Sequence, residues 1–139
     1  MRIAEIMNPV ETIEPGATVQ QAAERMRDLE IGSIPVCNGD RLVGIVTDRD
    51  ITIRATADGA NPTVHRVEQV MTPRVDYCLA DDEVHRAIEI MESKQVRRLP
   101  VLDRDHRLVG TVAIGDLAEA VEPGGSGEAL RKISKPKRS

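Results

Sequence analysis

Apolar positions along this chain follow two different periods, and the sequence of periods occurs twice. Apolar residues three and four apart predict a helix from about residue 18 and another from about residue 82. Each is followed by two short apolar runs around a turn, which predict a hairpin, and then by a shorter helix. The predicted hairpin strands are residues 34–37 with 42–46 and 99–101 with 108–112, and the closing helices are residues 50–55 and 116–121. The pattern predicts an α+β protein.

The repeat extends to individual residues. Four landmarks of the first copy return 64 to 66 residues later: Met7-x-Pro9 as Met71-x-Pro73, Ile34-Pro35-Val36 as Leu99-Pro100-Val101, Leu42-Val43-Gly44 as Leu108-Val109-Gly110, and Asp50 as Asp116. Chance does not explain four landmarks in one order. A copy of about 65 residues buries too little apolar area for comfortable stability. We therefore expect the copies to pack through their sheets around a pseudo-twofold axis.

The repeats predict the domain organisation. We assign residues 1–60 to the first repeat with the start of its linker, residues 61–122 to the second repeat, and residues 123–139 to a tail. The tail opens on Pro123-Gly124-Gly125-Ser126-Gly127, a composition typical of a flexible hinge.

Charge is distributed unevenly between the repeats and the tail. The net charge is −4, and residues 124–139 carry five basic residues and one acidic residue, so the remainder carries −8. An acidic body is a poor surface for nucleic acid, because contacts to phosphate supply most non-specific affinity. We expect a solvated tail; the alternative is a tail that contacts a phosphate-rich or acidic partner.

Composition excludes several other classes of protein. With no Trp, no Phe and one Tyr, the core has to be aliphatic. Cys37 and Cys78 are predicted to be buried free thiols, and three scattered histidines predict no metal site. No apolar run is long enough to cross a bilayer, and the N-terminus does not resemble a secretory signal, so we expect a cytoplasmic protein.

The stretch Gly44-Ile45-Val46-Thr47-Asp48-Arg49-Asp50 carries the candidate chemistry. Thr47 stands where a helix N-cap belongs, and Asp50 follows three residues later, the spacing of a capping box. The same arrangement suits a nucleotide, because free N–H groups attract a phosphate and a carboxylate accepts hydrogen bonds from ribose hydroxyls. A helix cap without a ligand is the alternative.

Taken together, the two Met-x-Pro motifs, the two x-Pro-Val motifs and the stretch ending at Asp50 resemble a tandem pair of cystathionine-β-synthase (CBS) domains, also called a Bateman module. The resemblance covers about residues 1–122. It implies two β-α-β-β-α repeats with clefts between them in which adenine nucleotides commonly bind, and it implies a homodimer. The chain is similar to small stand-alone bacterial proteins of this family.

The resemblance also implies site residues. Thr47 and Asp50 match residues that hold phosphate or ribose in one cleft, and Arg97 and Arg98 match basic residues that complete it. Two guanidinium groups are well suited to phosphate; an ordinary solvated pair is the alternative.

The second cleft and the adenine contacts are predicted separately. In the second cleft Asp116 is retained, but Ala113 replaces the usual hydroxyl, so we expect that cleft to be weak, empty or altered in ligand. Adenine is expected against apolar residues and backbone near Ile13, Ile34 and Pro35. Tyr77 is expected either to stack on a base or to pack at the repeat interface.

These observations favour a regulatory module that senses an adenine nucleotide such as AMP, ADP or ATP and signals through its conformation or dimer, acting on a protein partner. The main alternative is a structural or partner-binding dimerisation module whose clefts bind no nucleotide. No combination of residues typical of catalysis is present, so we predict neither an enzyme nor a required cofactor. Binding of nucleic acid through the tail is the least favoured class.

Overall fold

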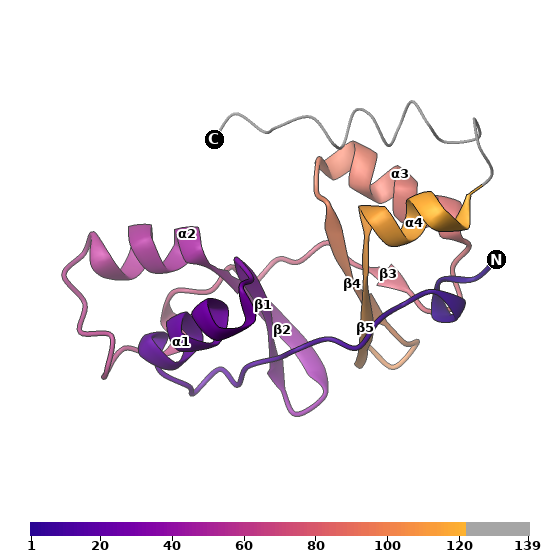
Figure 1. Cartoon of the computed structure of the whole chain (residues 1–139). Coiled ribbons are helices and arrows are strands. Elements are labelled where there is room, and N and C mark those ends of the chain that lie inside the picture. Colours follow the sequence, from indigo (N-terminus) through magenta and orange to yellow (C-terminus); the bar gives the residue numbers. More distant parts are fainter. Residues whose placement is uncertain (122–139) are drawn as a thin grey trace. The chain divides into compact units, whose positions relative to one another are not determined.

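One arrangement of helix, hairpin and helix follows another along the chain (Figure 1). The structure is a computed structural model, and it describes residues 1–121. The basic tail predicted at residues 123–139 lies outside the described residues. The α+β class and the tandem repeat are confirmed.

The first repeat contains one long helix and one hairpin. Its helices and strands are α1 (Val19–Leu29), β1 (Ser33–Asn38), β2 (Arg41–Thr47) and α2 (Asp48–Asp50), which continues as a π-helix, η2 (Ile51–Thr56). Strands β1 and β2 are antiparallel. The sequence also predicts an extended segment at Thr12-Ile13, and Ile13 forms a parallel bridge with Val36 on the other edge of β1.

The second repeat has the same order of helices and strands. They are β3 (Cys78–Leu79), α3 (Val84–Lys94), β4 (Arg98–Leu102), β5 (Leu108–Ala113) and α4 (Ile114–Ala120). Strand β3 is parallel to β4, and β4 is antiparallel to β5. Both closing helices begin two residues earlier than predicted, at Asp48 and Ile114.

Local sequence explains where helix α1 begins. The Thr18 hydroxyl accepts a hydrogen bond from the Gln21 amide at 3.1 Å, and the Gln21 side chain accepts one from the Thr18 amide at 2.9 Å. This reciprocal pair is a capping box, as the spacing Thr18-x-x-Gln21 in the sequence predicts. The dipeptide Asn38-Gly39 predicts the turn of the first hairpin, and the observed turn lies one residue later. Asn38 still pairs with Arg41, so the two-residue turn is Gly39-Asp40, and Gly39 adopts a φ of 66°.

The Met-x-Pro motifs follow short 3₁₀ helices, η1 (Ile3–Glu5) and η3 (Val67–Gln69). We call residues 1–10 the first Met-x-Pro segment and residues 66–75 the second. The described chain divides into two compact units, one containing residues 11–75 and the other containing residues 1–10 with the chain from Asp76 onward. Each Met-x-Pro segment therefore belongs to the unit that holds the helices and hairpin of the other repeat.

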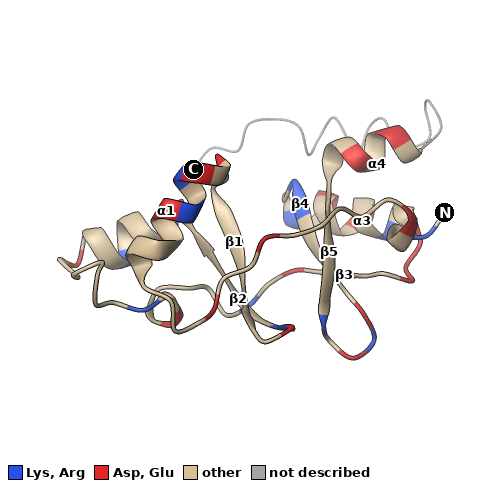
Figure 2. Ribbon diagram, turned by 60° about the horizontal axis from the view of Figure 1, so that its bottom comes forward, with Lys and Arg blue, Asp and Glu red and all other residues tan. Residues whose placement is uncertain are grey.

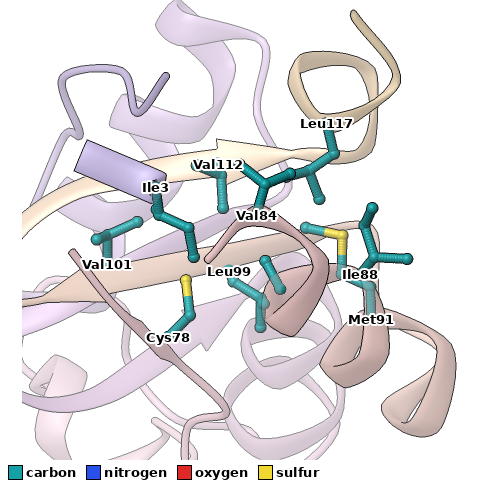
Figure 3. Close-up of a cluster of buried hydrophobic side chains, with 10 residues drawn as sticks. Ile3, Cys78, Val84, Ile88, Met91, Leu99, Val101, Val112 and Leu117 are labelled. Atoms are coloured by element: carbon teal, nitrogen blue, oxygen red, sulfur yellow. The ribbon is translucent and has the colours of Figure 1, made fainter. Parts of the chain in front are cut away.

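The hydrophobic core of each unit explains this exchange. Ile3 is fully buried among side chains of the second repeat, including Cys78, Leu99 and Val101 (Figure 3). In the other unit, Val67 and Val70 are buried in the core of the first repeat. Without the exchanged segment, each core would expose apolar side chains to water.

Both cysteines are free and buried, as predicted. Cys37 lies on β1 and Cys78 on β3. Burial, the largest influence, raises the pKa of the Cys37 thiol to about 11 and that of Cys78 to about 12. Both thiols are therefore protonated at neutral pH and react slowly as nucleophiles.

Candidate functional site

Among residues 1–121, Asp50 is the charged residue that the fold buries, with 9% of its surface exposed. It lies at the end of the first turn of α2, and Thr47 is the N-cap of that helix. The Thr47 hydroxyl accepts a hydrogen bond from the Asp50 amide at 3.0 Å, and Asp50 Oδ2 accepts one from the Thr47 amide at 3.0 Å. The capping box predicted from the sequence is therefore present, and it holds one oxygen of the carboxylate.

The other carboxylate oxygen of Asp50 is contacted by two side chains. Thr72, the middle residue of the second Met-x-Pro motif, donates its hydroxyl to Asp50 Oδ1 at 3.3 Å. The Arg54 guanidinium lies with its Nε 3.9 Å from the same oxygen. Arg54 also donates to the carbonyl of Met71 at 3.2 Å. Asp50 is thus linked to the second Met-x-Pro segment directly and through Arg54.

The backbone of that segment is fixed against strand β2. Thr72 and Ile45 exchange two backbone hydrogen bonds, at 2.8 and 2.9 Å. This close approach requires glycine at position 44, because a Cβ there would lie 2.7 Å from Met71 Sδ and 2.9 Å from the Thr72 carbonyl oxygen. The glycine of the repeated Leu-Val-Gly motif makes room for the Met-x-Pro segment.

The second unit has a similar arrangement, with different hydrogen bonds at its aspartate. Asn8 and Thr111 exchange two backbone hydrogen bonds beside Gly110, and the Asn8 side chain donates to Asp116 Oδ2 at 2.9 Å. The same oxygen accepts the Ala113 amide at 2.8 Å. Ala113 has no hydroxyl to accept the amide of Asp116, so only half of the capping box forms.

Arg97 and Arg98 are exposed at the start of β4, where Figure 2 shows a basic stretch. The carbonyl of Arg97 accepts the amide of Ile114 at 3.0 Å, and Arg98 pairs with Ala113 across the hairpin. Within their own unit, both arginines therefore lie beside the first turn of α4. Their predicted role at the Asp50 site joins residues of two units and stays a prediction.

The residues predicted to contact adenine lie on the first sheet. Ile13 and Ile34 are both in the hydrophobic core of their unit. Pro35 is buried, and its carbonyl accepts the Ile13 amide at 3.1 Å. The two isoleucines can therefore offer a ligand mainly their backbone groups. The sequence predicts backbone contacts to adenine as well as apolar side-chain contacts.

Tyr77 lies in a pocket of about 510 Å³ at the turn end of the β4–β5 hairpin. Its ring meets the His106 ring edge-on, with centroids 5.3 Å apart. Three aspartates and Arg104 also line this pocket, and Arg104 donates to Asp81 at 2.6 Å. The Tyr77 ring therefore contacts the turn of the hairpin, whereas Arg98 begins β4.

A second pocket, of about 630 Å³, lies between Ile13 and one side of helix α1. Its charged lining is mostly acidic, with Glu14, Glu24 and Asp28 against Arg25, which is paired with Glu11 at 2.7 Å. Carboxylates repel a phosphate group, so this pocket does not suit the charged end of a nucleotide.

Two further kinds of feature are absent from residues 1–121. No group of three or more His, Cys, Asp or Glu side chains is placed there to hold a metal ion. In the same residues, no helix combines the length and hydrophobicity needed to span a membrane.

Comparison with known proteins decides the family. The family model described as "CBS domain" matches twice, at residues 3–55 and 67–123. The chain belongs to the CBS-domain family. The resemblance inferred from the Met-x-Pro, x-Pro-Val and Thr47–Asp50 motifs is confirmed, and both matches coincide with the repeats found in the sequence.

Two relatives match this CBS pair over most of their own length. The chain is 38% identical to CBS domain-containing protein YhcV of Bacillus subtilis over 126 residues, covering 90% of this chain and 89% of YhcV. It is 38% identical to hypoxic response protein 1 of Mycobacterium tuberculosis over 116 residues, covering 82% and 80%. Both relatives are little longer than a CBS pair.

Solved structures confirm the fold. The crystal structure of hypoxic response protein I, described as having two coordinated zinc ions, matches with a TM-score of 0.77 and 36% identity, covering 87% of this chain and 99% of that one. The structure of CBSX2 of Arabidopsis thaliana in complex with AMP matches with a TM-score of 0.72 and 24% identity, covering 86% and 94%.

Sequence reasoning missed Thr72 and Asn8. Both occupy the variable position of Met-x-Pro, and both donate to the aspartate of a closing helix. The signal was available, because each residue carries a polar side chain between a methionine and a proline at matching places in the two repeats. Only the exchange of the segments between units reveals which aspartate each one contacts.

Proposed function

We propose that this CBS pair is a regulatory module that senses an adenine nucleotide, with Asp50 accepting the ribose hydroxyls. The observation that carries the proposal is the nearly buried Asp50 carboxylate, held at both oxygens by donors from its own unit. A fixed carboxylate binds a diol without losing further side-chain freedom. A relative of the same fold has been solved with AMP, which supports the choice of nucleotide.

The remaining predicted residues complete the proposed site. Thr47 is adjacent to the ribose-binding carboxylate, and Arg97 and Arg98 supply charge for the phosphate. Backbone near Ile13, Ile34 and Pro35 receives the adenine. Asp116 is the corresponding residue of a second, weaker site, because Ala113 offers no hydroxyl.

Signalling requires that the nucleotide bind one conformation or dimer arrangement more tightly than another. The proposed output is therefore a change in conformation or in a homodimer that a partner protein recognises. Neither a catalytic step nor a required cofactor is part of this proposal, and the proposed location is the cytoplasm.

Isothermal titration calorimetry with AMP, ADP and ATP tests the proposal on the wild type, Asp50→Asn, Asp116→Asn and Arg98→Ala. We expect one nucleotide to bind, with affinity lost in Asp50→Asn and mostly kept in Asp116→Asn. Arg98→Ala should weaken the same binding event by removing a charge that pairs with the phosphate, and unchanged affinity would exclude Arg98 from the site. In thermal unfolding, a ligand at 100 times its Kd adds about 2.7 kcal/mol.

A structural dimerisation module is the second candidate function. It is favoured by the fact that Asp50 and Asp116 already accept hydrogen bonds from their own units. Under this alternative the aspartates fasten the Met-x-Pro segments and bind no ligand. Absence of heat and of any thermal shift with all three nucleotides would support it.

A further inference from the structure

Thr72 is placed to set the orientation of the Asp50 carboxylate. Its hydroxyl donates to Oδ1 at 3.3 Å, while the Thr47 amide donates to Oδ2 at 3.0 Å. Thr47 precedes Asp50 in the sequence, and Thr72 follows it. Because the two donors bind different oxygens, they fix the rotation of the carboxylate plane about χ2. With either donor alone, that plane turns more freely, because terminal sp³–sp² torsions are broad.

The backbone of Thr72, which carries this hydroxyl, is itself held in place. The residue exchanges two backbone hydrogen bonds with Ile45, and its carbonyl lies against Gly44. Arg54 adds a second constraint, because it contacts both Asp50 Oδ1 and the Met71 carbonyl. The donor is therefore held by a strand rather than by a free loop.

The carboxylate retains capacity for a ligand. Two carboxylate oxygens offer about four acceptor positions. One hydrogen bond is made at each oxygen of Asp50 within the unit, so acceptor positions remain on both. Two neighbouring hydroxyls, as on a ribose, match two oxygens of one carboxylate whose plane is fixed.

We propose that Thr72 is a positioning residue that gives the Asp50 site its preference for ribose over 2′-deoxyribose. This inference rests on the proposed function and deepens it, because it assigns the sugar specificity to a residue from the second Met-x-Pro segment. Thr72 does not contact the ligand; it acts by holding the carboxylate in the orientation that two hydroxyls require.

The second unit provides an internal comparison. Asn8 donates to Asp116 Oδ2, the oxygen that already accepts the Ala113 amide. Both of these hydrogen bonds are to Oδ2 of Asp116. That carboxylate is therefore held at one oxygen, and its plane is less constrained than that of Asp50.

The test compares AMP with 2′-deoxy-AMP, whose sugar lacks one hydroxyl. Calorimetry gives both Kd values for the wild type, Thr72→Val and Thr72→Ser. We expect the wild type to prefer AMP and Thr72→Val to lose about tenfold in AMP affinity with a smaller loss for 2′-deoxy-AMP. Thr72→Ser keeps a hydroxyl and should keep the preference. A general loosening of the fold would weaken both ligands alike.

Thr63→Val is the matched control, because Thr63 also donates its hydroxyl within the same unit, to Asn61 at 2.7 Å. It should leave both Kd values unchanged. Circular dichroism shows whether Thr72→Val folds. If it does not, Thr72→Ala takes its place in the comparison, because alanine also lacks the hydroxyl and adds no second methyl group.

Three outcomes overturn the inference. An unchanged ratio of the two Kd values in Thr72→Val overturns it and leaves nucleotide sensing intact. A Thr72→Ser protein that behaves like Thr72→Val excludes the hydroxyl as the cause. A wild type that binds neither nucleotide overturns the proposed function, and the role of Thr72 fails with it.

Discussion

The side-chain amide of Asn8 donates to the carboxylate of Asp116 at 2.9 Å, although 108 residues separate them in sequence. Asp116 belongs to the closing helix of the second repeat, and Asn8 lies at the start of the first repeat, before its helices and hairpin. Thr72 and Asp50 form the corresponding pair in the other unit. The segment that introduces each repeat is thus fastened to the closing helix of the other.

The pair of Asn8 and Asp116 should therefore contribute measurably to stability. Hydrogen bonds to charged groups contribute about 1.5–3 kcal/mol when buried, and this pair is partly exposed, so we expect a coupling of about 1 kcal/mol. A double-mutant cycle with Asn8→Ala and Asp116→Asn, measured by urea unfolding, gives that coupling. Strictly additive losses would mean that the two side chains act independently.

The glycines of the Leu-Val-Gly motif should tolerate no side chain. A Cβ on Gly110 would lie 2.9 Å from both the Asn8 carbonyl oxygen and Met7 Sδ, and Gly44 is as crowded. Forcing atoms into such sites costs about 1–3 kcal/mol, so Gly110→Ala and Gly44→Ala should each lower the free energy of unfolding by that amount. Urea unfolding measures the loss.

Gly16→Ala is the control for that series, because a Cβ at position 16 meets no atom within 4 Å. A surface change of this kind should alter the free energy of unfolding by no more than about 0.5 kcal/mol. Equal effects at positions 16 and 110 would contradict the close packing of the Met-x-Pro segments against the strands.

Much of the fold could be predicted from local sequence. The Thr18–Gln21 capping box forms as its spacing indicates, because both partners lie within one helical turn. The repeat in turn predicts that Asp50 and Asp116 occupy matching places. Local rules were less reliable at the hairpin, where Asn38-Gly39 indicated a turn but Asn38 remains paired with Arg41.

The long-range contacts of the site could not be predicted in the same way. No local pattern indicates that Thr72 reaches Asp50 or that Ile3 enters the core of the second repeat, since both depend on where a distant segment packs. The capping residues Thr47 and Asp50 were found because helix capping is local. The role of Arg97 and Arg98 rests on the family resemblance and stays a prediction.

Restoring the missing hydroxyl at position 113 should stabilise the second closing helix. The backbone of Ala113, at φ −115° and ψ 162°, nearly matches that of Thr47, at φ −117° and ψ 163°. Ala113→Thr should therefore let the hydroxyl accept the Asp116 amide and add about 1 kcal/mol to the free energy of unfolding. Ala113→Val, of the same shape without an acceptor, is the control, and a gain no larger than that of valine would contradict the prediction.

The buried thiol of Cys37 should make stability depend on pH above neutrality. Burial raises its pKa from 9.0 to about 11, so the folded state holds the proton more tightly than the unfolded state. The resulting stabilisation is complete below about pH 8.5 and is lost as the pH rises through 11. Urea unfolding from pH 7 to 11 should show the wild type losing its advantage over Cys37→Ala, by about 2 kcal/mol at pH 11. A difference between the two proteins that stays constant over this range would mean that the thiol ionises as easily in the folded chain as in the unfolded one.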